Sequence, residues 1–239
     1  MILDFLKPRA SDVTPDGEDR YAIQRRYMVE EISAMAHEIY GHGEVHISRN
    51  VLDVMEKVPR HRFVPEDESY AAYFNHPLPI GHGQTISQPF IVALMTELLA
   101  LSKHDRVLEV GTGSGYQAAV LAEMAGEIYC MEIVEPLATR AKTLLNDLGY
   151  SNVQVKNGDG YMGWPEHAPF DAIIVTAAAT HVPQPLLDQI KPGGRMVIPV
   201  GEYGATQQLL LIRKSHGGEL HHKNVLPVSF VPLTGGHDA

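Results

Sequence analysis

The sequence predicts an α/β fold: a mostly parallel, doubly wound sheet with antiparallel strands near the C-terminal end and a helical addition at the N-terminal end. Between residues 106 and 200, apolar runs of strand length alternate with longer helical patterns, which is the signature of stacked βαβ units. One of these runs leads directly into a glycine-rich turn. A chain of 239 residues with 44% hydrophobic residues can bury the core of one large domain, or of one domain with an appendage.

The N-terminal part of the sequence differs in character from the rest. We expect residues 1–77 to form a tail and a helical addition, and residues 78–239 to form a single compact domain. Residues 11–18 are polar and acidic and carry Pro15 and Gly17, so they cannot bury much surface. Disorder or loose docking is expected for that segment.

Two helices are expected in the N-terminal addition. Between about Glu18 and Tyr40, apolar residues recur at steps of three, four and seven, which gives a helix one apolar stripe. Ser48 can cap a second helix over residues 49–57, which Pro59 closes. A loop with further prolines follows and leads into the predicted sheet.

The expected sheet is assembled from short apolar strands with helices between them. The strands are placed at residues 106–110, 127–133, 153–156, 172–176 and 195–200, and the helices at about residues 115–124, 136–148 and 184–190. Near the C-terminus the pattern changes. Residues 207–214 and 220–226 indicate a hairpin, and residues 229–233 could form one more strand.

Charge and cysteine content exclude several classes of partner. The formal net charge of −10 argues against broad attraction to nucleic acid or anionic lipid, because both bind basic surfaces. Cys130 is the single cysteine, which fits a reducing compartment. The N-terminus lacks the apolar core of a signal peptide, and no apolar run reaches membrane-spanning length. We expect a cytoplasmic monomer with no nucleic-acid or membrane partner.

The most informative feature is the run from Val107 to Tyr116, in which an apolar strand leads into a turn with the spacing G-x-G-x-G and then into a helix. Glycines let the backbone approach a ligand closely, and the unpaired amides of a helix N-terminus favour negative groups. A dinucleotide site is the rival interpretation, but its G-x-G-x-x-G pattern requires a third glycine where this chain has Tyr116. A tight turn without a ligand is the other alternative.

This turn, with an acid two residues before its first glycine, resembles the first motif of class I S-adenosylmethionine methyltransferases. The segments 169–176 and 190–194 resemble later motifs of that family. The resemblance implies a Rossmann-like fold, S-adenosyl-L-methionine as cofactor and S-adenosyl-L-homocysteine as product. It assigns an acid at the end of the next strand to the ribose hydroxyls, and a later Gly-Asp-Gly to the adenine amine. The implied cofactor-binding residues are Glu109, Gly111, Gly113, Ser114, Gly115, Glu132, Asp159 and Gly160.

A second motif lies upstream of the glycine turn. The segment Gly83–Pro89, together with Val58–Pro65 and Phe230–Leu233, closely resembles the protein-L-isoaspartate O-methyltransferase family. The resemblance implies a repair enzyme that methylates the free carboxylate of L-isoaspartyl residues in damaged peptides and proteins, after which a succinimide forms and partly returns to aspartate. The expected substrate-binding residues are Thr85, Ile86, Ser87 and Val231, with Ser87 as the catalytic residue.

The chemistry accounts for the residue types in this loop. An aspartyl-type carboxylic acid, with a pKa of about 3.9, is already ionised at neutral pH, so no general base is required. The hydroxyls of Thr85 and Ser87 can direct one carboxylate oxygen toward the methyl carbon, so catalysis is chiefly positioning and exclusion of water. Ser87 can equally cap the helix that contains residues 90–99, and the two roles are compatible. A peptide could pair with the backbone around residues 229–231 by strand addition.

Other functions stay open on the sequence alone. Another class I methyltransferase could act on a small-molecule carboxylate or hydroxyl, or on nucleic acid, and a non-catalytic cofactor-binding protein is a further alternative. The lack of an amine-methylation motif of the Asn-Pro-Pro-Tyr type weakens the nucleic-acid version. No metal site is predicted, because glycines separate His37, His42 and His46 and no ligand spacing typical of zinc occurs.

Overall fold

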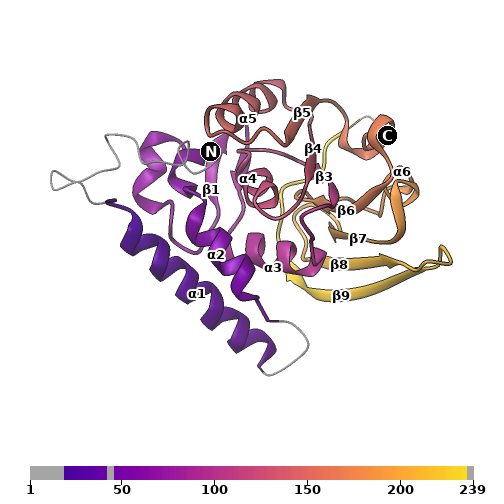
Figure 1. Ribbon diagram of the computed structural model, residues 1–239, viewed down its shortest axis with the longest axis horizontal. Coiled ribbons are helices and arrows are strands. Elements are labelled where there is room, and N and C mark those ends of the chain that lie inside the picture. The colour runs from indigo at the N-terminus through magenta and orange to yellow at the C-terminus, as the bar shows by residue number, and fades with distance from the viewer. Residues whose placement is uncertain (1–18, 42–45, 236–239) are drawn as a thin grey trace.

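The structure is a computed structural model that describes residues 19–41 and 46–235, so the acidic segment of residues 11–18 lies outside the described residues. Seven strands form one sheet in the order β5 (Val153–Asn157), β4 (Glu127–Glu132), β3 (Arg106–Val110), β6 (Phe170–Val175), β7 (Ile190–Val200), β8 (Gln207–Lys214) and β9 (Leu220–Val228). The first five run parallel, whereas β8 is antiparallel to both of its neighbours. The predicted α/β sheet with antiparallel C-terminal strands is confirmed (Figure 1).

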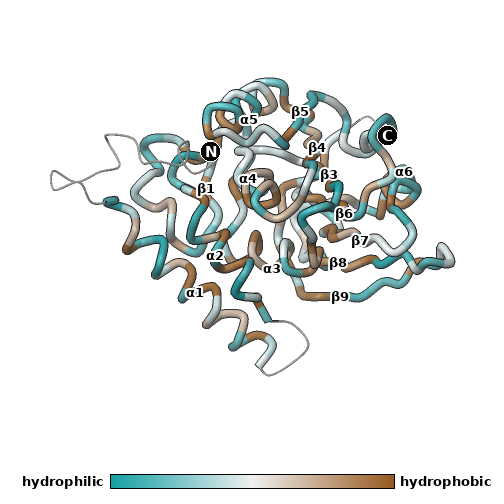
Figure 2. Tube along the Cα trace, in the orientation of Figure 1, coloured by the Kyte–Doolittle hydropathy of each residue, from teal (hydrophilic) through white to brown (hydrophobic). Residues whose placement is uncertain are grey.

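Helices cover both faces of this sheet. α3 (Pro89–Leu99), α4 (Tyr116–Ala122) and α5 (Glu135–Asp147) pack on one face, and α6 (Gln184–Asp188) lies on the other. Successive strand residues point to opposite faces, so Val107 and Leu108 of β3 enter two separate buried clusters. Figure 2 shows hydrophobic segments concentrated in the central strands and α3. The sheet is therefore buried on both sides, as a parallel sheet requires.

The N-terminal helices share the core of the sheet. α1 (Ala22–Tyr40) packs on α2 (Arg49–Lys57) and on α3, and its Met28 belongs to the same buried cluster as Val107. Both predicted helices are confirmed, and the Ser48 hydroxyl caps the first turn of α2. Across the two described stretches of chain, no helix combines the length and the apolar character that crossing a membrane requires.

The segment between α2 and α3 contains more structure than the expected loop. It forms two short 3₁₀ helices, Arg60–Phe63 and Glu66–Ala71, and a hairpin of β1 (Leu78–Gly81) and β2 (Gln84–Ile86). Strands of three or four residues are too short to show an alternating pattern, and the proline at position 79 disfavours a strand assignment. The hairpin fixes the approach of the chain to the start of α3.

The segment after β9 does not form the additional strand expected at residues 229–233. Within the described residues, an isolated bridge joins Pro232 to Ala178. The Gln207 side chain forms hydrogen bonds with both backbone groups of Phe230. Its Oε1 accepts a hydrogen bond from the Phe230 amide at 2.7 Å, and its Nε2 donates one to the Phe230 carbonyl at 3.3 Å. A proline cannot donate to a strand ladder. The segment is therefore held in place without becoming a strand.

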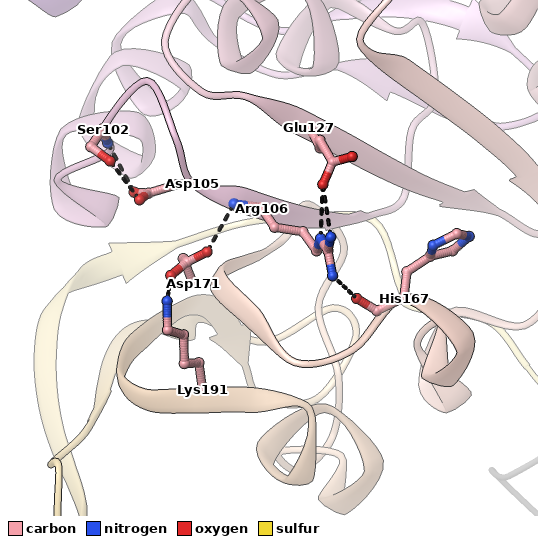
Figure 3. A network of polar contacts seen from close by, with 7 residues as sticks. All are labelled: Ser102, Asp105, Arg106, Glu127, His167, Asp171 and Lys191. Atoms are coloured by element: carbon pink, nitrogen blue, oxygen red, sulfur yellow. Dashed lines mark hydrogen bonds and ion pairs between the residues drawn. The ribbon is translucent and has the colours of Figure 1, made fainter.

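A network of charged residues joins the amino ends of four strands (Figure 3). The Asp171 carboxylate accepts a hydrogen bond from the Arg106 amide at 2.9 Å and pairs with Lys191. The Arg106 guanidinium in turn pairs with Glu127 at 2.9 Å. These contacts tie β3, β4, β6 and β7 together at the end of the sheet opposite the glycine-rich turn. Asp171 therefore has a structural role.

Candidate functional site

A cavity opens at the carboxyl ends of β3, β4 and β6. It is lined by the ends of these strands, by the glycine-rich turn, by the β2 segment and by the chain that follows β9. The chain reverses direction across the sheet between β3 and β6, since β4 and β5 lie on one side of β3 and the later strands on the other. Such a switch point is where open α/β sheets bind ligands. The fold thus places the predicted cofactor loop and the predicted substrate loop around one space.

The glycine turn has a conformation that requires glycine at its first position. Gly111 has a φ of 92°, and a Cβ built on it would lie 2.7 Å from the Thr176 hydroxyl oxygen. That hydroxyl donates a hydrogen bond to the Gly111 carbonyl at 2.5 Å, and the Gly111 amide donates to the Met131 carbonyl at 2.8 Å. The turn is therefore locked to the ends of both β4 and β6, and it leaves the backbone open to a ligand.

The Glu132 carboxylate holds the same turn from the end of β4. Its Oε2 accepts a hydrogen bond from the Gly113 amide at 2.7 Å, and its Oε1 accepts one from the Val134 amide at 2.9 Å. The side chain is 6% exposed and lines the cavity. Each carboxylate oxygen can accept a second hydrogen bond, so Glu132 retains acceptor capacity for ligand hydroxyls.

Glu109 lies beneath the turn and outside the lining of the cavity. It is fully buried on β3 and faces Cys130, its register partner on β4. Burial raises the pKa of Glu109; a hydrogen bond with the Cys130 thiol opposes this effect and the nearby Glu132 carboxylate adds to it, so that the pKa lies at about 8. The raised pKa keeps Glu109 mostly protonated at pH 7.

A Glu109→Gln variant should be stabilised more at pH 8 than at pH 5.5. Over this range the unfolded Glu109 carboxyl is already ionised whereas the folded one loses its proton only near pH 8, so the unfolded state binds fewer protons and the free energy of unfolding falls as pH rises. Glutamine has no such loss, and its advantage should grow by roughly 3 kcal/mol over this range. Urea unfolding at both pH values measures it. The exposed Glu30→Gln variant is the control, and an equal advantage at both pH values would contradict the raised pKa.

The residues of the Gly-Asp-Gly segment after β5 have different roles. Gly160 lines the cavity, and a Cβ there would lie 2.3 Å from a Val110 methyl carbon, so a side chain would close the space. The Asp159 carboxylate accepts a hydrogen bond from the Tyr161 amide at 2.9 Å and thereby caps a short helical turn. Asp159 stands beside the cavity and not in its lining.

The two remaining residues of the glycine turn also differ. Ser114 lines the cavity, and its hydroxyl accepts a hydrogen bond from the Tyr116 amide at 3.2 Å. Gly115 begins α4 with a φ of 87°, and a Cβ there would contact Leu145 of α5 at 3.3 Å. Gly115 thus allows close helix packing, while Gly111, Gly113 and Ser114 face the cavity.

The substrate loop enters the same cavity from the β2 end. Thr85, Ile86, Ser87 and Val231 all line it, so the structure brings the four predicted residues together. The interpretation of Ser87 as the cap of α3 is wrong. The N-cap residue is Gln88, and the Asn75 side chain accepts the hydrogen bond of the Phe90 amide at 3.0 Å from a distant part of the chain. Among the described residues the Ser87 hydroxyl has no hydrogen-bond partner, which leaves it available to a ligand.

Several residues that line the cavity were not predicted from the sequence as site residues. Thr176 ends the motif segment 169–176 but was not predicted as a site residue, although it contacts the glycine turn. Ile133 follows the strand-end acid, lines the cavity and keeps 38% of its surface exposed. A large apolar residue beside the predicted ribose site could have indicated from the sequence that Ile133 belongs to the cofactor site. Gln84, within the Gly83–Pro89 segment, and Thr234, which follows Leu233, also line the cavity.

A second cavity, of about 530 Å³, continues outward from the first. The two share Thr85, Ser87, Thr176 and Val231. Beyond these residues the second cavity is bounded by α1, α3, the end of β9 and the segment that follows it, with largely apolar side chains. We call this second cavity the apolar groove. An extended chain lying in the groove could present one side chain to Ser87.

Comparisons with known proteins agree with this geometry. A family model described as Protein-L-isoaspartate(D-aspartate) O-methyltransferase matches residues 30–238. The chain is 52% identical over 238 residues to protein-L-isoaspartate O-methyltransferase 2 of Syntrophobacter fumaroxidans, over 99% of this chain and 96% of that protein. It is 57% identical to protein-L-isoaspartate O-methyltransferase 1 of Nitrosospira multiformis, over 94% of this chain and 93% of that protein.

A solved structure from Plasmodium falciparum also resembles the fold. It is described as a protein-L-isoaspartate O-methyltransferase in complex with S-adenosyl-L-homocysteine. It is 26% identical, with a TM-score of 0.74 over 88% of this chain and 98% of that chain.

Proposed function

The chain belongs to the protein-L-isoaspartate(D-aspartate) O-methyltransferase family, and from that premise we propose how its residues divide the work of the reaction. The enzyme transfers a methyl group from S-adenosyl-L-methionine to the free carboxylate of L-isoaspartyl residues in damaged proteins. The methyl ester leads to a succinimide and partial return to aspartate. We assign both binding sites to the cavity at the carboxyl ends of β3, β4 and β6.

The cofactor site is assigned to the glycine turn and the residues around it. S-adenosyl-L-methionine supplies a methyl group bonded to a positively charged sulfur. We propose that Gly111, Gly113, Ser114 and Gly115 build the backbone cradle for its methionine part, with Glu109 supporting them from beneath. Glu132 retains acceptor capacity for the ribose hydroxyls. Asp159 and Gly160 are assigned to the adenine end, where the lack of a Gly160 side chain keeps the space open.

The free Ser87 hydroxyl is the single observation that carries the catalytic assignment. It lines both the cavity and the apolar groove, and it has no partner among the described residues. A hydroxyl in that position can donate to one oxygen of the isoaspartyl carboxylate and direct the other toward the methyl carbon. Thr85 is assigned a supporting contact, and Ile86 excludes water. The carboxylate is ionised already, so no side chain has to remove a proton.

The apolar groove favours a peptide over a small-molecule acceptor. It extends past the reacting position toward α1 and β9, which is space that a small carboxylate would leave empty. We propose that residues 78–239 form the methyltransferase unit and that the addition within residues 1–77 walls its groove, since Met35 and Ile39 of α1 line it. All site residues come from one chain, which favours a monomer. The free Cys130 thiol favours a cytoplasmic location.

Paired peptides test the acceptor directly. The protein is incubated with labelled cofactor and with two peptides that differ only in carrying isoaspartate or aspartate at one position. Base-labile label on the isoaspartyl peptide alone is the expected result. Equal labelling of both peptides, or of neither, would refute the assignment. Labelling of a small carboxylic acid in place of either peptide would favour the alternative O-methyltransferase.

Val231→Pro should raise KM for the isoaspartyl peptide about tenfold, because one backbone hydrogen bond to substrate is lost and the proline ring crowds its place. The Val231 carbonyl already accepts from the Ala178 amide at 2.8 Å, whereas the Val231 amide has no partner among the described residues. Strand addition by the substrate would therefore use that amide. Val231→Ala keeps the amide and is the control. Unchanged peptide affinity in the proline variant would count against backbone pairing.

A further inference from the structure

Thr176 stands at the boundary between the cavity and the apolar groove. It follows the last residue of β6 directly, at the carboxyl end of that strand. The other residues that line both spaces, Thr85, Ser87 and Val231, belong to the substrate loop and to the chain after β9. Within the described parts of the chain, Thr176 is the member of this group whose side chain forms a hydrogen bond with the glycine turn. It therefore contacts the proposed cofactor site and the proposed peptide site at once.

The hydroxyl of Thr176 is committed to the glycine turn. Its Oγ1 lies 2.5 Å from the Gly111 carbonyl oxygen and 3.1 Å from the Val110 carbonyl oxygen. A hydroxyl carries one proton, and the Val110 carbonyl already accepts a hydrogen bond from the Thr176 amide at 2.9 Å, so the proton belongs on the Gly111 side. The described residues supply no other donor to the Gly111 carbonyl. Loss of the hydroxyl would leave that carbonyl without a partner in the described structure.

The same side chain presents its methyl group to the apolar groove. The amide and the hydroxyl of Thr176 both bond with the backbone at the end of β3 and the start of the turn, which leaves the γ-methyl group to face the open space. The methyl group continues an apolar wall to which Phe90 and Ile91 of α3 also belong. In a β-branched side chain the hydroxyl and the methyl group share one χ1 angle, so the hydrogen bond that fixes one also fixes the other.

We propose that Thr176 is a positioning residue that sets the distance between the cofactor and the acceptor carboxylate. Its hydroxyl holds the glycine turn, and its methyl group bounds the groove beside Ser87. The inference rests on the proposed function. Methyl transfer requires a carboxylate oxygen about 3 to 3.5 Å from the methyl carbon, and a misplacement of about 1 Å is costly. One stiff side chain that touches both sites keeps this spacing without taking part in the making of the bond.

Two substitutions separate the halves of the side chain. Thr176→Val keeps the methyl group and loses the hydroxyl, so the dissociation constant of S-adenosyl-L-homocysteine should rise about tenfold. KM for an isoaspartyl peptide, with saturating cofactor, should stay within about twofold of the wild type. Thr176→Ser keeps the hydroxyl and loses the methyl group, so this dissociation constant should stay within about twofold while KM for the peptide rises about fourfold. In both variants kcat should fall about fivefold, because each loosens one side of the reacting pair.

This crossed pattern distinguishes a positioning role from a merely structural one. Calorimetric titration gives the dissociation constant, steady-state kinetics give KM and kcat, and thermal melts check folding. Thr143→Val and Thr143→Ser make the same chemical changes on the exposed face of α5, outside the lining of the cavity and of the groove. Both should match the wild type in all three constants.

Different outcomes overturn different parts of the inference. If the two Thr176 variants weaken cofactor binding equally, or if neither weakens it, the hydroxyl does not hold the turn. If Thr176→Ser leaves KM for the peptide unchanged, the methyl group does not bound the groove. If the dissociation constant and KM rise together in both variants, in step with a fall in Tm, Thr176 is only structural. If the wild type methylates no isoaspartyl peptide, the proposed function fails, and the titration still shows whether the hydroxyl holds the turn.

Discussion

Replacing Ser87 with alanine is expected to lower kcat about 100-fold, because loss of an orienting contact of this kind leaves the carboxylate in unproductive positions. The dissociation constant for S-adenosyl-L-methionine should stay within about twofold, since the glycine turn and Glu132 are untouched. Ser87 lines the cavity without capping α3. Its removal therefore leaves the helix start intact, and the loss reports on catalysis and not on folding.

The measurement combines steady-state kinetics on an isoaspartyl peptide with calorimetric titration of the cofactor. Ser87→Thr keeps a hydroxyl and should recover part of kcat, whereas Ser151→Ala, in an exposed turn, should behave as the wild type. A kcat equal to that of the wild type in Ser87→Ala would remove the positioning role. A fall in cofactor affinity as large as the fall in kcat would instead indicate that Ser87 holds the turn.

The parallel sheet was predictable because its strands are buried on both faces. Residues 106–110 match β3 at both ends, since an apolar run bounded by charge and glycine leaves little freedom in placing it. The hairpin of β1 and β2 was missed because its strands are short and contain a proline, and its pairing depends on a turn with three positive φ angles at residues 81–83. Glycines at positions 81 and 83 permit such a turn, but strands this short carry no pattern that fixes their pairing.

The sequence predicted many of the residues that line the candidate cavity, but few of the contacts that they make. The glycine spacing and the strand-end acid indicated a ligand at the switch point, but nothing in the sequence links Glu132 to the Gly113 amide. The capping role expected of Ser87 failed because Asn75, distant in sequence, satisfies the helix amide in its place. Glu109 was expected at the ligand, whereas strand alternation turns its side chain into the core beside Cys130.

Glu132→Ala should weaken S-adenosyl-L-methionine binding about 100-fold, which corresponds to the loss of one or two hydrogen bonds to a charged acceptor. The change removes the proposed contact to the ribose, and it also frees the Gly113 amide, so the turn loses one of its anchors on β4. With saturating cofactor, kcat should fall less than threefold, because Ser87 is unaffected. Calorimetric titration with S-adenosyl-L-homocysteine measures the dissociation constant of the cofactor site in the absence of turnover.

The glutamine variant at this position separates the two roles of the carboxylate. Glu132 accepts from the Gly113 amide with one oxygen and from the Val134 amide with the other, and a glutamine side chain has only one oxygen. Its amino group would face an N–H donor, so Glu132→Gln should bind cofactor almost as weakly as Glu132→Ala. Glu135→Gln, exposed at the start of α5, is the matched control and should bind normally. Normal binding by Glu132→Gln would mean that the paired amide contacts do not shape the cofactor site, and an unchanged dissociation constant in Glu132→Ala would remove Glu132 from that site.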